Sequence, residues 1–302
     1  MTIKVESRTG TLALVAALVT VLLWASAFVA IRYVGRELSA GALSLGRLIV
    51  AAVVLGAMMV ADDRRAAVPR PWPGRRHWPR LLIVGVVWFG VYNVALNQAE
   101  RLIDAGTAAM LVNVGPLLIA ILAGLLLGEG FPRPLIAGSA IAFAGVVLIG
   151  TATSTTSTVS TWGAVLCLVA AVSYAVGVVA QKPLLADLSG LRVTWLACVI
   201  GAVVCLPYAP TLVRELAAAQ PASVWWLVYL GVFPTAIGFT TWAYALARTS
   251  AGRLGATTYL VPAVAIVLAW ALLGEVPPVL ALAGGALCLV GVAISRRPAK
   301  PA

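Results

Sequence analysis

The chain carries the stretch LVNVGPLLIAILAGLLLGEGF at residues 111–131 and a second version of it, TYLVPAVAIVLAWALLGEVP, at residues 258–277. Each version places a proline inside a long apolar run and a Gly-Glu pair at the end of that run. Pro116 and Pro262 are 146 residues apart, and so are Glu129 and Glu275. This spacing indicates an internal repeat.

The repeat extends well beyond these two stretches. Aligning residues 99–146 with residues 245–292 gives 16 identities in 48 positions, and these include matched Pro, Glu and Gly. Shared membrane composition inflates Leu and Ala matches but not these. The low-complexity stretch TATSTTSTVST (151–161) is the natural boundary. We therefore expect two repeats, residues 1–151 and 152–302.

The composition requires a membrane. Of the 302 residues, 62% are hydrophobic and 10% are charged, with a mean hydropathy of +1.03. Soluble domains are about half apolar and about one quarter charged. A spanning helix needs about 20 apolar residues, which predicts ten spans: about 11–33, 39–61, 81–99, 105–127, 134–151, 160–182, 192–209, 223–247, 253–274 and 279–295.

The predicted fold class is an all-α polytopic membrane protein with ten transmembrane helices arranged as two inverted five-helix repeats. The inversion follows because five is odd, so that the second repeat begins on the opposite side of the membrane. Inverted repeats are typical of alternating-access transporters, in which the substrate site lies near the midplane at the repeat interface.

The net charge of +11 is a topology signal rather than a nucleic-acid signal. If the N-terminus is inside, 16 of the 21 basic residues fall in cytoplasmic segments, as the positive-inside rule requires. Both termini are then cytoplasmic. The four cysteines lie in apolar spans without paired spacing and the chain has one histidine, so we expect no metal and no cofactor.

Taken together, the ten spans, the five-plus-five repeat, the motif LLWASAFVAIR in the first span and the P…LLGE endings of the fourth and ninth spans resemble the EamA-type transporters of the drug/metabolite transporter superfamily. The resemblance covers residues 12–295. It implies transport, commonly export, of small metabolites across the bacterial inner membrane, with amino acids as the commonest substrate class. It does not fix the substrate.

The mid-span prolines should kink their helices and free the carbonyls of Val112 and Thr258. A freed carbonyl is costly in lipid, so the kinks should face the interior. Asn113 and Tyr259 are equivalent in the two repeats, and we expect them to face each other at the pocket. Alternatively, both hydrogen-bond the freed backbone.

The Gly-Glu pairs, Gly128 with Glu129 and Gly274 with Glu275, predict helix-turn elbows. Each glycine suits the position after a helix end, and each acid lies near a helix N-terminus, where the dipole favours it. We favour this structural role over gating or proton coupling. All ten acids lie at span ends or in loops, which weighs against cation/proton antiport.

Arg47 is the only charge well inside a predicted span. It could attract a substrate carboxylate or phosphate. It could instead brace helix-end carbonyls or a neighbouring helix, which is the reading that we favour.

Further candidate substrate-binding residues come from spans three, eight, one and six. Span three offers an aromatic pair and an amide pair, each at i,i+4 spacing, although the amides could simply bond neighbouring helices. Span eight adds polar and aromatic groups and a further proline, and spans one and six add aromatics paired by the repeat: Trp88, Tyr92, Asn93, Asn97, Pro234, Thr241, Trp242, Trp24 and Tyr174.

The function expected from these features is an alternating-access carrier that exports an amino acid or a similar small metabolite. The alternative is a multidrug or lipid-linked metabolite translocator of the same fold. A membrane-embedded enzyme would need convergent acids or histidines, so we expect no catalytic residues. The expected partners are a small-molecule substrate and membrane lipids, with the protein a monomer or a homodimer.

Overall fold

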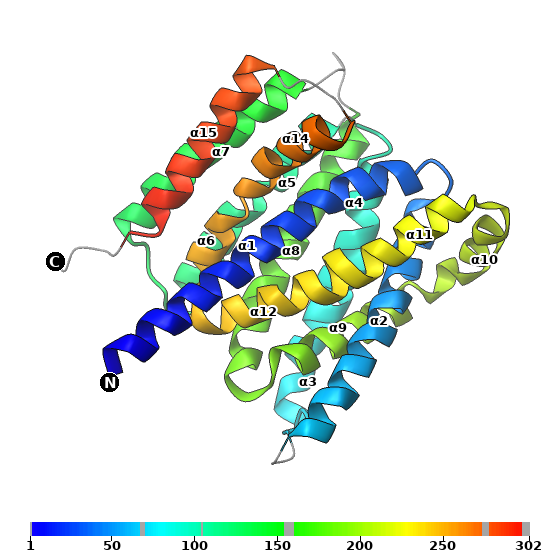
Figure 1. Ribbon diagram of the computed structural model, residues 1–302, viewed down its shortest axis with the longest axis horizontal. Helices are drawn as coiled ribbons and strands as arrows, with labels where there is room; N and C mark the ends of the chain where they lie inside the picture. Colours follow the sequence, from blue (N-terminus) through cyan, green and yellow to red (C-terminus); the bar gives the residue numbers. More distant parts are fainter. Residues whose placement is uncertain (1, 67–69, 104, 154–159, 274–277, 298–302) are drawn as a thin grey trace.

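The computed structural model describes residues 2–66, 70–103, 105–153, 160–273 and 278–297. Within these ranges the regular secondary structure is helical and no strand occurs. The helices form one bundle, with the N-terminal end of α1 and the C-terminal end of α15 at the same end (Figure 1). Large apolar side chains such as Val53, Leu125 and Leu289 are exposed on its outer surface, as a lipid-facing surface requires.

The first half of the chain contains two 3-10 or π segments among its α-helices. In order, the elements are α1 (Thr2–Val34), α2 (Ala40–Arg65), the 3-10 turn η1 (Arg75–His77), α3 (Trp78–Leu82), the π-helix η2 (Ile83–Tyr92), α4 (Asn93–Ala99), α5 (Ala105–Val112), α6 (Gly115–Leu126) and α7 (Arg133–Thr153).

The second half is built similarly. Its elements are α8 (Thr161–Asp187), α9 (Gly190–Val204), the 3-10 turn η3 (Leu206–Tyr208), α10 (Ala209–Ala218), α11 (Pro221–Leu230), the π-helix η4 (Gly231–Ile237), α12 (Gly238–Arg248), α13 (Ala251–Thr257), α14 (Leu260–Leu273) and α15 (Val279–Ser295).

Seven helices of the described residues are long and apolar enough to cross a membrane. An eighth would be α9 with the segment 206–218, which is bent by 53°. Two further predicted spans correspond to shorter apolar helices, Met110–Leu126 and Val279–Ser295. An all-helical chain with many apolar spans is therefore confirmed.

The two mid-span prolines lie at the start of a helix, just after a short break in the span. Pro116 lies in the first turn of α6, after α5 has ended at Val112, and Pro262 lies in the first turn of α14, after α13 has ended at Thr257. The carbonyl of Thr258 accepts a hydrogen bond from the amide of Val261 (2.9 Å). Each expected kink is a short break within its span, with the proline in the first turn of the following helix, where it is easily accommodated.

Pro234 does lie inside a continuous helix, within the π-helical segment η4. Proline has no amide to donate to the carbonyl four residues earlier. Here the hydroxyl of Thr235 donates to that carbonyl, of Leu230, at 2.7 Å. A side chain therefore replaces the missing backbone donor.

A glycine seam joins α7 to α15, which lie side by side along one edge of the bundle (Figure 1). A Cβ placed on Gly138 would lie 2.4 Å from the carbonyl oxygen of Gly291, and one on Gly145 would lie 2.5 Å from that of Gly284. Only glycine permits such close backbone approach. These glycines face one another between two helices of the same chain, so they pack within the protein rather than against a second copy.

Glu129 caps a helix of the other half of the chain. Its carboxylate accepts hydrogen bonds from the amides of Ala251 (2.7 Å) and Gly252 (3.0 Å), at the N-terminus of α13. Gly128 precedes it with φ +69°, as expected after a helix end. We expected Glu129 to lie near the N-terminus of the helix that follows it; the helix that it caps is α13. The equivalent Gly274 and Glu275 lie outside the described residues.

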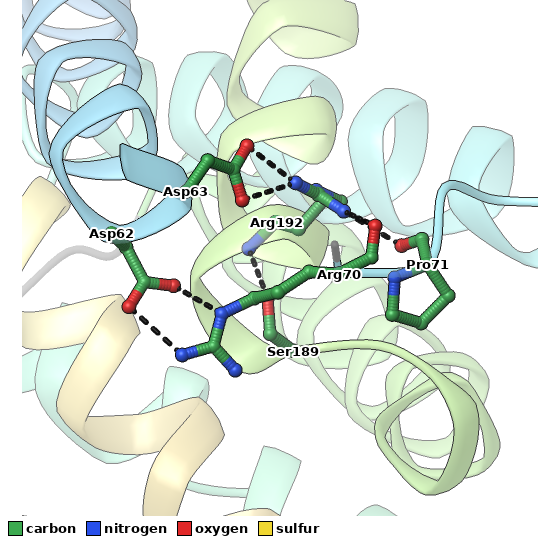
Figure 2. A network of polar contacts seen from close by, with 6 residues as sticks. All are labelled: Asp62, Asp63, Arg70, Pro71, Ser189 and Arg192. Atoms are coloured by element: carbon green, nitrogen blue, oxygen red, sulfur yellow. Dashed lines mark hydrogen bonds and ion pairs between the residues drawn. The ribbon is translucent and has the colours of Figure 1, made fainter. Parts of the chain in front are cut away.

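An ion pair between a buried arginine and a half-buried carboxylate lies at one end of the bundle (Figure 2). Nη2 of Arg192, in the first turn of α9, lies 2.7 Å from both oxygens of Asp63 at the end of α2, and Nη1 donates to the carbonyls of Arg70 and Pro71. The side chain of Arg192 is 1% exposed. A more exposed ion pair, between Arg70 and Asp62, lies beside it. This network ties α2 and the segment after it to α9.

Candidate functional site

A cavity of about 80 Å³ lies in the interior of the bundle. It has room for roughly five to eight water-sized groups, which is the size of a small amino acid. Its lining comes from both halves of the chain: Trp24, Ala27, Phe28, Ile31, Arg47, Trp88, Tyr92, Asn93, Leu96, Val112, Asn113, Pro116, Tyr174, Phe239, Thr258 and Val261.

Aromatic rings contribute six of the sixteen residues of the cavity wall. The Trp24 ring packs edge-on against Tyr174 (centroids 6.1 Å apart), and the Trp88 ring contacts both Tyr174 (5.5 Å) and Phe239 (5.1 Å). Gly177 of α8 lets Trp88 pack closely, because a Cβ there would lie 2.5 Å from that of Trp88. Rings held in mutual contact provide a rigid apolar surface.

Arg47 supplies the positive charge of the cavity. Its side chain donates from Nε (3.1 Å) and Nη2 (3.0 Å) to Oγ1 of Thr235, the hydroxyl that also satisfies the Leu230 carbonyl. Arg47 is 6% exposed, and the ion pairs found among the described residues do not include it. The bracing role that we favoured and a cavity-lining position therefore occur together.

The remaining polar groups of the wall lie at the helix break and in span three. Asn113 follows the end of α5, and Thr258 follows the end of α13, so that the two breaks bring one polar residue each to the cavity. Asn93 donates Nδ2 to the carbonyl of Phe89 (2.8 Å), which fixes the orientation of its amide. The breaks thus carry out the role predicted for the prolines.

Four of the expected substrate-binding residues, and two of the three mid-span prolines (Pro234 and Pro262), lie outside the cavity lining. Asn97 donates to Ser44 (2.9 Å) and lines a different cavity, and Thr241 contacts Thr20 (2.9 Å). Trp242 stacks on Trp24 (5.1 Å) from behind the wall. Tyr259 packs against Phe143 (6.4 Å), not in the lining, and Pro262 likewise does not line the cavity.

The sequence analysis missed two important wall residues, Phe239 and Thr258. Phe239 lies three positions before Trp242 and hence on the same helical face, which was the available signal. Thr258 is the neighbour of the predicted Tyr259. Helical spacing could not identify Thr258 as a wall residue, because α13 ends at Thr257, before this residue.

Three comparisons with known proteins bear on this site. The sequence profile of the EamA-like transporter family matches residues 11–151 and 161–297. A probable terminal-alkyne amino-acid exporter of Streptantibioticus cattleyicolor is 42% identical over 283 residues, covering 93% of this chain and 92% of the relative.

A probable amino-acid metabolite efflux pump of Salmonella typhimurium is 25% identical over 229 residues, covering 72% of this chain and 77% of the pump. A solved crystal structure superposes with a TM-score of 0.77 at 21% identity, covering 94% of this chain and 96% of the other. At that identity the superposition shows a shared fold only.

Proposed function

The chain belongs to the EamA-like transporter family, and from this premise we propose that it is an alternating-access carrier that exports amino acids or related small metabolites across the bacterial inner membrane. The two relatives described above, named as an amino-acid exporter and an amino-acid metabolite efflux pump, support this substrate class.

The observation that carries the proposal is the guanidinium of Arg47 on the cavity wall. Burying a charge is costly unless it is paired, and among the described residues this guanidinium bonds only the hydroxyl of Thr235. A substrate carboxylate would complete its hydrogen bonding. Arginine suits this role because its planar fork matches the two oxygens of a carboxylate.

The aromatic wall suits the rest of an amino acid. Tryptophan and tyrosine faces attract an ammonium group through cation–π interaction, at about 2 kcal/mol where water is excluded. The same rings receive an apolar side chain. We therefore propose that the substrate contacts Arg47, Asn93, Asn113 and the aromatic lining residues, with Thr241, Trp242 and Tyr259 packing behind them.

We further propose that residues 1–151 and 152–302 are inverted five-span repeats. Both halves contain a π-helical segment (η2, η4) followed by a broken helix pair (α5–α6, α13–α14). A shift of 146 residues also exchanges the two glycine contacts of the seam, since Gly138 corresponds to Gly284 and Gly145 to Gly291. Broken helices at a repeat interface are the usual setting of a transporter site.

Counterflow in proteoliposomes tests the proposed function. Vesicles preloaded with unlabelled L-leucine or L-propargylglycine, a terminal-alkyne amino acid, should take up the labelled compound saturably. Arg47→Gln should abolish this uptake because the carboxylate loses its partner. The matched control is Arg214→Gln, since Arg214 is exposed and bonds only within its own helix.

Two outcomes would contradict the proposal. Full activity of Arg47→Gln would remove Arg47 from the site. Failure of any amino acid in a full panel to exchange, together with uptake of a cationic dye or a lipid analogue, would favour the multidrug or lipid-linked translocator.

A further inference from the structure

A second cavity, of about 300 Å³, lies beside the first and shares Ile31 with it. It lies between the C-terminal end of α1, the start of α2 and the C-terminal end of α4, at the end of the bundle that the proposed topology places outside. Half of its lining residues carry charged or amide groups: Arg32, Arg36, Asn97, Glu100 and Arg101.

Two oxygen atoms of this lining have no hydrogen-bond partner in the described part of the chain. They are Oδ1 of Asn97, a residue only 3% exposed, and Oε1 of Glu100. Both are acceptors, and a buried acceptor without a donor is unfavourable. A proton on the Glu100 carboxyl would convert one of the two into a donor.

The surroundings of Glu100 disfavour its charged form. The residue is the C-cap of α4, where the backbone carbonyls make negative charge unfavourable. Burial raises the pKa of Glu100 to about 7, although Arg32 and then Arg47 oppose the increase. The sequence analysis placed Glu100 at a span end, as the structure does, but could not show that its Oε1 atom is buried there.

The titratable groups around Glu100 come from every neighbouring element. The cations are on α1, the segment after it, α2 and the residue after Glu100 itself, and neutral groups lie on η2 and α8: Arg32, Arg36, Arg47, Arg101, Tyr92 and Cys167. None of these is a second acid. Glu100 is therefore the one carboxyl among these groups, and its raised pKa lies near neutral pH.

We propose that Glu100 is the proton-binding carboxyl that couples substrate export to proton entry. The inference rests on the proposed carrier function. A proton from the outer side binds one oxygen of Glu100, crosses with the conformational change and leaves to the inner side. No covalent bond other than this O–H forms or breaks.

The physical basis of the coupling is the different cost of the two protonation states in this cavity. The neutral carboxyl tolerates the cavity as it stands, whereas the carboxylate requires more water or rearranged cations around it. Protonation therefore favours the arrangement of this structure, and deprotonation favours a more hydrated one. A proton shifts this equilibrium because its affinity differs between the two states.

Proteoliposomes with labelled L-leucine and L-propargylglycine test the inference. With one pH unit imposed across the membrane, one-for-one exchange with protons drives up to roughly tenfold substrate accumulation. Wild-type protein should approach this, and Glu100→Gln should fall to no accumulation while keeping its counterflow. Glu100→Asp, which keeps a titratable group, should restore accumulation.

The matched control is Asp62→Asn, which removes the acid of the Arg70–Asp62 ion pair drawn in Figure 2 and should accumulate substrate like the wild type. Undiminished accumulation in Glu100→Gln would overturn the inference. So would wild-type counterflow that does not respond to the pH gradient, and in that case the carrier function stands. Absence of counterflow in the wild type would instead overturn the proposed function itself.

Discussion

At the scale of single residues, two buried arginines show how partners separate a structural role from a functional one. Arg192 has a carboxylate and two backbone carbonyls around its two Nη atoms, and only its Nε lacks a partner among the described residues. Arg47 has one hydroxyl. The same side chain therefore holds the fold in one place and, in the other, lies on the cavity wall where we propose that it binds the substrate.

Removal of Asp63 should destabilise the protein much more than removal of its neighbour Asp62. Asp63→Ala leaves the Arg192 guanidinium, 1% exposed, without its counter-charge; because Asp63 itself is 35% exposed, we expect the lower end of the cost for a buried pair, about 3 kcal/mol. Asp62→Ala breaks a pair whose side chains are 35–42% exposed, worth less than about 1 kcal/mol. Thermal unfolding in detergent measures both, and equal midpoints would contradict the structural role of Arg192.

At the scale of elements, the helices are shaped by where the backbone lacks a donor or can approach another backbone. Proline starts α6 and α14, so that each predicted span is two helices with a polar residue at the break. Glycine lets α7 and α15 touch through their backbones. The breaks supply polarity to the cavity, and the seam supplies a rigid edge.

Adjacent glycines in α15 should respond oppositely to alanine. A Cβ on Gly284 would lie 2.6 Å from the carbonyl oxygen of Gly145, whereas one on Gly285 would meet its nearest atom, of Ala263, at an ordinary 3.6 Å. Gly284→Ala should therefore cost about 1–3 kcal/mol. Gly285→Ala should gain up to about 1 kcal/mol from helix propensity.

Thermal unfolding of the two variants in the same detergent checks this pair. If Gly284→Ala is as stable as Gly285→Ala, the two helices do not pack as closely as the seam requires.

At the scale of the whole molecule, the cavity has walls from both halves of the chain. Neither half encloses it alone, because α1, α2, η2 and α4 to α6 contribute one part and α8, α12 and the α13–α14 break contribute the other. Relative movement of two such halves would open the cavity to one side at a time. The proposed inverted arrangement gives both openings similar geometry.

Reporter fusions test that arrangement. With five spans in the first repeat, alkaline phosphatase inserted after residue 156 should be active outside the membrane, and green fluorescent protein fused to the C-terminus should fluoresce inside the cell. An inactive phosphatase at 156 together with a fluorescent C-terminus would mean that the first half crosses an even number of times.

The sequence by itself determined the class of the molecule. Its apolar content requires a helical membrane protein, and the matched Pro, Glu and Gly of the two halves point to a repeat. It also selected much of the cavity wall, including Trp24, Arg47, Trp88 and Tyr174. These follow from composition and from helical spacing, which are local properties.

Only the tertiary structure decided which polar groups are paired. Residues far apart in the chain determine three of these features: the hydrogen bond from Arg47 to Thr235, the capping of α13 by Glu129, and the burial of Oε1 of Glu100. Likewise, Thr258 rather than Tyr259 lines the cavity. The span is broken here, between the end of α13 at Thr257 and the start of α14 at Leu260. The physical reason is that burial and pairing are set by packing between helices, which no spacing within a single helix encodes.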